Sequence, residues 1–121
     1  TVIIAVGIND LRKAPVKTAI SRYSSLLNEL KELQNVYIHE VLPIDKNILG
    51  NVLQNKIMVF NQELFKLTKE FANIHYLPGS SVFFDSNGSL KPSLHLGDGL
   101  HLNEKGYDIW INQLRKQLRK Q

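Results

Sequence analysis

Gly7, Asn9 and Asp10 are the first residues whose types and spacing suggest chemistry. They follow the apolar run Val2–Val6, which predicts a strand, and open α/β sheets bind their ligands at the carboxyl ends of strands. Gly7 allows a sharp turn, and the Asn9 side chain carries an N–H₂ group that can donate to a developing oxyanion. The alternative is an ordinary loop, because Asn and Asp are frequent turn and capping residues.

Asp98 and His101 form the second group, in the segment before the last expected helix. A carboxylate three residues before a histidine can fold back and accept the imidazole Nδ1–H. That contact fixes the tautomer and leaves Nε2 free to act as a general base. The alternative is that both residues belong to a loop that caps the start of the helix.

The two groups together resemble the sequence blocks of the SGNH (GDSL-type) hydrolases. Gly7–Asp10 looks like the G-x-N-D block of that family. Asp98–Asn103, followed by Gly106–Tyr107, looks like its C-terminal D-x-x-H block. The order and separation of the blocks and the elements between them also match, so that the resemblance covers nearly all of the chain.

This resemblance implies a serine esterase that cleaves acyl esters without a metal or an organic cofactor. His101 is then the general base and acid, Asp98 orients His101, and Asn9 donates to the oxyanion. Gly7 and Asp10 support the oxyanion loop. We therefore expect Asn9 and His101 to face one cleft at the carboxyl edge of the sheet.

No serine of the chain lies in the sequence pattern that the nucleophile of such a site requires. The family's G-D-S block and a glycine block precede the G-x-N-D block, and Thr1 falls just before the latter. The serines present lie on an expected helix or in turn-rich sequence without a nucleophile-elbow pattern: Ser21, Ser24, Ser25, Ser80, Ser81, Ser86, Ser89 and Ser93. The chain is therefore expected to be the C-terminal part of a larger domain, completed by an N-terminal segment or a partner chain.

Alternating strand and helix patterns surround these residues. Short apolar runs predict strands at 2–6, 36–42 and 74–77, and Phe83–Phe84 adds a brief extended piece. Three- and four-residue apolar spacing predicts helices from Pro15 to Leu33, from Leu49 to Phe71, and after Asn103, which is a good N-cap. The last helix is expected to bury one face: Tyr107, Trp110, Ile111, Leu114 and Leu118.

The strand–helix order predicts an α/β fold in which helices lie on both sides of a parallel sheet. The resemblance implies the flavodoxin-like three-layer α/β/α sandwich, with its N-terminal part missing. Residues 1–121 then form a single domain. Val2–Val6 is expected to be central and buried on both faces, because parallel strands are usually covered on each side.

Composition excludes several classes of function. The 121 residues contain no cysteine, which rules out disulfides, thiolate zinc sites and a cysteine nucleophile, and favours a reducing, cytoplasmic location. No apolar run is long enough to cross a membrane. The net charge of +4 permits an acidic partner. Two alternatives to the esterase therefore stay open: a non-catalytic SGNH-like binding module or remnant, and a domain of a mobile-element or nucleic-acid-associated protein.

Overall fold

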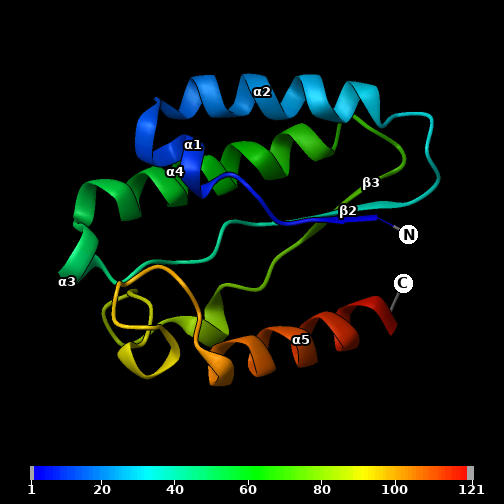
Figure 1. Ribbon diagram of the computed structural model, residues 1–121. Helices are drawn as coiled ribbons and strands as arrows, with labels where there is room; N and C mark the ends of the chain where they lie inside the picture. Colours follow the sequence, from blue (N-terminus) through cyan, green and yellow to red (C-terminus); the bar gives the residue numbers. More distant parts are fainter. Residues whose placement is uncertain (1, 120–121) are drawn as a thin grey trace. The chain divides into compact units, whose positions relative to one another are not determined.

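The computed structural model describes residues 2–119, which form a three-stranded parallel sheet, α-helices and short 3₁₀ helices (Figure 1). In chain order the elements are β1 (Val2–Ile4), α1 (Ile8–Lys13), α2 (Val16–Glu29), β2 (Val36–His39), α3 (Lys46–Leu49), α4 (Asn51–Thr68), β3 (Ile74–Leu77), the 3₁₀ helices η1 (Ser81–Phe83) and η2 (Pro92–Leu94), and α5 (Glu104–Arg119). They divide into two compact units. Unit 1 contains residues 2–41 and 55–78, and unit 2 contains residues 42–54 and 79–119.

The sheet belongs to unit 1 and has the order β1-β2-β3, with both neighbouring pairs parallel. Val36 of β2 aligns with Val2 of β1 and with Ile74 of β3. The central strand, β2, is buried at all four positions. The α/β class and the parallel sheet predicted from the sequence are therefore confirmed.

β1 differs from the prediction in length. It ends at Ile4, and among the described residues it pairs with β2 alone, so it lies at an edge of this sheet. Val2 and Ile3 are each 39% exposed. The predicted strand is therefore present but shorter, and its exposed edge agrees with the expectation that part of the sheet lies outside these residues. That the strand is central and buried on both faces in a larger domain stays a prediction.

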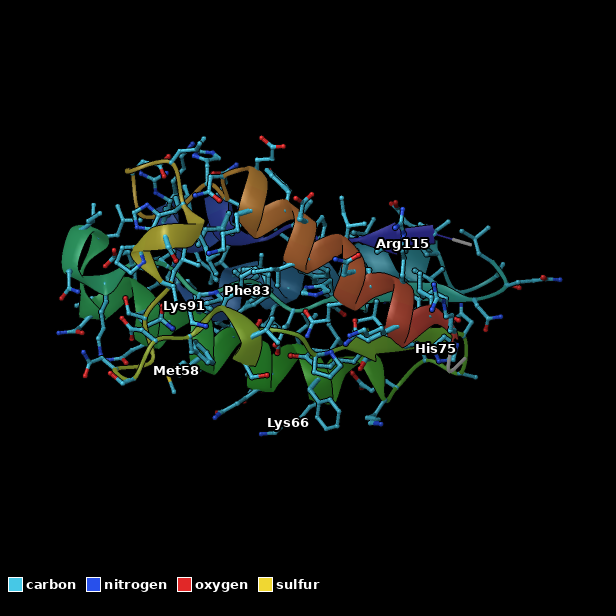
Figure 2. The ribbon with its side chains drawn as sticks, turned by 90° about the horizontal axis from the view of Figure 1, so that it is seen from below. Met58, Lys66, His75, Phe83, Lys91 and Arg115 are labelled. Carbon is cyan, nitrogen blue, oxygen red and sulfur yellow. The ribbon has the colours of Figure 1, made fainter. Side chains whose placement is uncertain are left out.

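α2 and α4 lie side by side on one face of the sheet (Figure 1). The rings of Tyr23 on α2 and Phe60 on α4 are 5.6 Å apart, and Leu27 and Leu64 are fully buried. A strand order that follows the sequence, with crossovers of one hand, puts both connecting helices on the same face. The opposite side of α4 faces outward: Met58 and Lys66 project from it (Figure 2).

The helices differ from the sequence prediction at three places. α1, between Ile8 and Lys13, is unexpected, because six residues are too few for a clear helical period. The helix predicted from Leu49 to Phe71 is α4, which spans Asn51–Thr68, and the short α3 that precedes it at Lys46–Leu49 was not predicted. α2 ends at Glu29, and Leu33, which was expected to extend its apolar face, is 45% exposed.

Unit 2 contains its own small apolar core within mostly irregular chain. Its buried members are Phe83, Leu90, Leu94 and Leu102, and Leu42, Ile109 and Trp110 pack against them. Phe83, which lies in the interior in Figure 2, belongs to η1 and not to the extended piece predicted at Phe83–Phe84. Phe84 does form an antiparallel bridge, with Leu90. The strand prediction is therefore wrong for Phe83, where the chain curls to bury the ring.

α5 begins as the sequence predicts but turns a slightly different face inward. The Asn103 side-chain oxygen accepts from the backbone N–H of Gly106 at 2.9 Å, which is the predicted N-cap contact. Tyr107 and Ile111 are 47% and 42% exposed, contrary to the prediction. Trp110 packs on the core as predicted, and the inward side also includes Gly106 and Ile109, because the chain packs closely against the side of the helix that bears Gly106.

Candidate active site

Asp98 and His101 form a hydrogen-bonded pair in the loop before α5, as the sequence predicted. His101 Nδ1 and Asp98 Oδ2 are 2.5 Å apart. The other carboxylate oxygen of Asp98 accepts the backbone N–H groups of Leu100 and His101, at 2.9 and 3.0 Å. Asp98 thus orients the imidazole ring and also shapes the turn that carries it.

The electrostatics of this pair fix the tautomer of His101. The hydrogen bond from His101, followed by those from the two backbone N–H groups, holds the pKa of Asp98 well below its usual range. Asp98 is therefore an ionised acceptor at neutral pH, and His101 donates from Nδ1. Nε2 is left with no hydrogen-bond partner among residues 2–119, and 63% of the side chain is exposed. A general base needs this accessible, unprotonated nitrogen.

Gly7 and Asn9 lie in unit 1, at the start of α1. Gly7 precedes the helix with φ of 131°, a conformation that strongly favours glycine. A Cβ there would also lie 3.2 Å from Val41 Cγ2. Asn9 is exposed, and among the described residues its side chain has no hydrogen-bond partner. Its N–H₂ group is thus available to an incoming ligand.

The Asp10 side chain, unlike that of Asn9, is held in an ion pair. Its carboxylate accepts from Arg22 of α2 at 2.8 Å, in an ion pair whose side chains are 60% and 41% exposed for Arg22 and Asp10. Such an exposed pair contributes at most about 1 kcal/mol to stability. It joins the first turn of α1 to α2 beside Asn9.

Asn9 lines a pocket of about 220 Å³ that lies wholly within unit 1. The other lining residues are Val6, Gly7, Asp10, Arg22, Tyr23 and Leu26. Arg22 and Tyr23 carry no functional signal in the sequence, because helical spacing assigns Tyr23 to a core face and gives Arg22 no role. The only available signal was that both lie on the first helix after the Gly7–Asp10 block.

The structure thus brings together two groups of the predicted site residues. Gly7, Asn9 and Asp10 are adjacent in unit 1, and Asp98 and His101 are paired in unit 2. Within residues 2–119 no cluster of three or more His, Cys, Asp or Glu residues could hold a metal ion. No helix in the same part of the chain is long and apolar enough to cross a membrane.

Comparison with known proteins supports the fold at low sequence identity. No protein-family model and no curated protein matches the chain. Among solved structures, one described as a platelet activating factor from Streptococcus pneumonia aligns with a TM-score of 0.85 and 23% identity, over 96% of this chain and 58% of its own. An acylhydrolase from Bacteroides fragilis gives a TM-score of 0.80 and 20% identity, over 98% and 60% of the two chains. A GDSL-like lipase from Bacteroides thetaiotaomicron gives 0.79 and 20%, over 98% and 61%.

These similarities establish that the chain has an SGNH (GDSL-type) hydrolase-like fold, as the motifs predicted. The chain spans about three fifths of the length of the structures that it matches. Similar folds host different functions, so the function must be argued from the site.

Proposed function

We propose that this chain forms the greater part of an SGNH-type serine ester hydrolase. The observation that carries the proposal is the Asp98–His101 pair, with an ionised carboxylate on Nδ1 and an accessible Nε2. The similarity to an acylhydrolase and a GDSL-like lipase supports the same class of reaction. The substrate is an acyl ester, and the residues proposed for the reaction need no cofactor.

The proposed reaction has two stages that share one base. In the first, a serine hydroxyl attacks the ester carbonyl carbon and gives its proton to His101 Nε2. The Asn9 N–H₂ group donates to the oxyanion that forms. His101 then returns the proton to the departing alcohol, which leaves an acyl-enzyme. In the second stage, water attacks the acyl carbon by the same route and releases the acid and the free serine.

The serine is proposed to come from outside these 121 residues, on an N-terminal segment or a partner chain. Among residues 2–119, no serine hydroxyl hydrogen-bonds to the His101 ring. Ser89, a serine of unit 2, is fully buried, and its hydroxyl accepts the Lys46 N–H and contacts Ile44 O. The proposal further requires that Asn9 and His101 meet in one site.

The first prediction concerns turnover by the chain joined to the sequence that precedes Thr1 in its gene, where we expect a Gly-Asp-Ser segment. That protein should hydrolyse p-nitrophenyl acetate. His101→Ala should lower kcat by about 10²–10⁴, because the general base is lost. Asn9→Ala should lower it by about 10²–10³, the usual effect of losing one oxyanion donor. Asp98→Asn should reduce it less than His101→Ala.

His75→Ala is the matched control, since this histidine lies on β3 and hydrogen-bonds to Asn35. It should leave kcat unchanged, and residues 1–121 alone should show no turnover above background. Full activity of His101→Ala would reject the general-base role. An absence of turnover in every form, with the upstream segment present, would instead favour the non-catalytic binding module.

A further inference from the structure

A second Asp–His pair lies beneath the loop that carries Asp98 and His101. His95 Nε2 and Asp45 Oδ2 are 3.0 Å apart, and only 4% and 5% of the two side chains are exposed. Asp45 caps the start of α3, and His95 directly follows η2, so the pair joins positions 50 residues apart. Both residues belong to unit 2.

The hydrogen bonds of His95 define its tautomer. Its Nδ1 accepts the backbone N–H groups of Gly97 at 2.9 Å and Gly99 at 3.3 Å, so Nδ1 carries no proton. Nε2 therefore carries the proton and donates it to Asp45. Burial raises the pKa of Asp45, but hydrogen bonds from His95 and from the Asn47 backbone N–H outweigh it and hold the pKa below its ordinary value. Asp45 is thus an ionised acceptor.

The same two residues hold the backbone of Gly99 from both sides. The Gly99 N–H donates to His95, and the Gly99 carbonyl accepts the Asp45 backbone N–H at 2.8 Å. Gly99 has φ of 78°, and a Cβ there would lie 3.1 Å from Ile48 Cβ and 3.3 Å from Asp45 Cβ. Gly99 stands between Asp98 and His101, so its backbone helps to set the separation of those two side chains.

We propose that Asp45 and His95 are positioning residues that hold the 97–101 loop in the conformation that pairs Asp98 with His101. The ends of this loop have little apolar packing, since Leu96, directly before it, is 69% exposed, and the His101 side chain is 63% exposed. Buried hydrogen bonds, rather than apolar contacts, therefore hold the loop in its conformation. The catalytic meaning of this arrangement rests on the proposed esterase function, whereas the arrangement itself does not.

Asp45→Asn tests the proposal through the tautomer. One oxygen of Asp45 accepts from the Asn47 backbone and the other from His95. An asparagine must place its N–H₂ group toward one of these two donors. Facing the ring, it requires His95 to accept at Nε2 and to carry its proton on Nδ1. The Nδ1 proton would then face the N–H groups of Gly97 and Gly99. Both hydrogen bonds to the loop would be lost.

His95→Asn and Asp85→Asn complete the set of variants. An asparagine at 95 can still accept the N–H two residues later, as in an Asx turn, but it cannot reach Asp45. His95→Asn should therefore weaken the hydrogen bond of the Gly99 N–H more than that of the Gly97 N–H. Asp85 is the matched control: its side chain accepts the backbone N–H groups of Asn87 and Ser89 in unit 2, and its replacement by Asn removes the same charge as Asp45→Asn.

The structural readout is NMR on the protein form used in the ester assay. In the unmodified protein, ¹⁵N spectra of the histidine rings should show His95 protonated on Nε2 alone at neutral pH; the opposite tautomer would overturn the proposal without any variant. In Asp45→Asn, amide exchange at Gly99 should quicken by about tenfold, roughly the effect of one lost hydrogen bond. The Asn103 amide, bonded to Leu94 O, is the internal reference, and equal acceleration there would also count against the proposal.

The kinetic readout separates positioning from simple stabilisation. Asp45→Asn should lower kcat by about 10²-fold with little change in KM, because misplacing a catalytic group by about 1 Å has an effect of this size. Asp85→Asn should leave both constants unchanged. If Asp45→Asn lowers the melting temperature but leaves kcat intact well below it, the pair is only structural and the proposal fails. If the unmodified protein has no ester turnover, the proposed function fails, while the tautomer and exchange results still decide whether the pair holds the loop.

Discussion

Two Asp–His pairs of the same chemical type have opposite surroundings in this protein. In the Asp98–His101 pair the imidazole side chain is 63% exposed, whereas in the Asp45–His95 pair it is 4% exposed. The exposed ring donates from Nδ1 and leaves Nε2 accessible, as a general base requires. The buried ring donates from Nε2 and uses Nδ1 to hold backbone. The environment, not the residue type, decides which histidine can exchange protons with a substrate.

Tyr23 offers a test of the pocket that contains Asn9. Its hydroxyl donates to Val6 O at 2.7 Å, directly before Gly7, and burial raises its pKa to about 12. A raised pKa means that the folded state favours the neutral phenol, so this stabilisation is complete below pH 10 and is lost as the pH rises from 10 to 12. Tyr23→Phe should lower the free energy of unfolding by about 1 kcal/mol at pH 7.

Urea unfolding of both proteins at pH 7 and at pH 11–12 measures this effect. The difference in stability between Tyr23→Phe and the unmodified protein should shrink or reverse at the higher pH, because phenylalanine has no proton to lose. Tyr107→Phe is the control, since Tyr107 lies on the exposed side of α5. A difference that stays constant across this range would contradict the assignment of the buried phenol.

Local residue contacts could be predicted from the sequence, whereas distant ones could not. Asp98 and His101 are three residues apart, and Asn103 caps the helix that it immediately precedes, so each contact follows from short-range geometry. Asp45 and His95 are 50 residues apart, and no spacing rule connects them. Nothing in the sequence around His95 indicates that its ring points into the interior of unit 2 toward Asp45.

At the scale of elements, periodicity predicted the types of the three strands and of the long helices correctly, and their ends less well. β3 and the start of α5 agree with the sequence prediction, because Pro78 and Asn103 are strong local signals. α1 and α3 were missed, and the helix predicted from Leu49 begins at Asn51, after Gly50. Short helices and helix breaks depend on packing partners that come from elsewhere in the chain.

Gly106 shows how closely α5 packs on its own unit. A Cβ at this position would lie 2.6 Å from Leu94 O and 3.1 Å from Leu102 Cβ, and the first of these is a backbone atom that cannot simply rotate away. Gly106→Ala should therefore destabilise the protein by about 1–3 kcal/mol, as overpacking does, although alanine favours a helix. Thermal unfolding followed by circular dichroism measures the loss.

The control for this substitution is Asn112→Ala, at an exposed position on α5. It should leave the melting temperature unchanged or raise it slightly, because alanine is the better helix former. A Gly106→Ala protein as stable as the original would show that α5 can move away from η2 at no cost.

At the scale of the whole molecule, the fold is similar to that of an acylhydrolase and a GDSL-like lipase, and the chain accounts for about three fifths of their length. The free edge of β1 is the feature of unit 1 that most requires a partner. Parallel sheets are normally covered on their faces and flanked by further strands. Val2 and Ile3 nevertheless remain 39% exposed, and among residues 2–119 β1 has one pairing partner, β2.

An exposed apolar strand edge presents unpaired backbone groups that can pair with another chain. We therefore expect residues 1–121, expressed alone, to elute from a sizing column above the 13.8 kDa of one chain. Val2→Lys should shift the protein toward the monomer, because a lysine on an edge strand opposes strand pairing. Val52→Lys is the matched control, since Val52 is an apolar residue of α4 with 77% exposure and belongs to no strand. Light scattering across a range of concentrations distinguishes the outcomes: a monomer without any substitution, or equal dissociation by both lysines, would show that the β1 edge does not drive association.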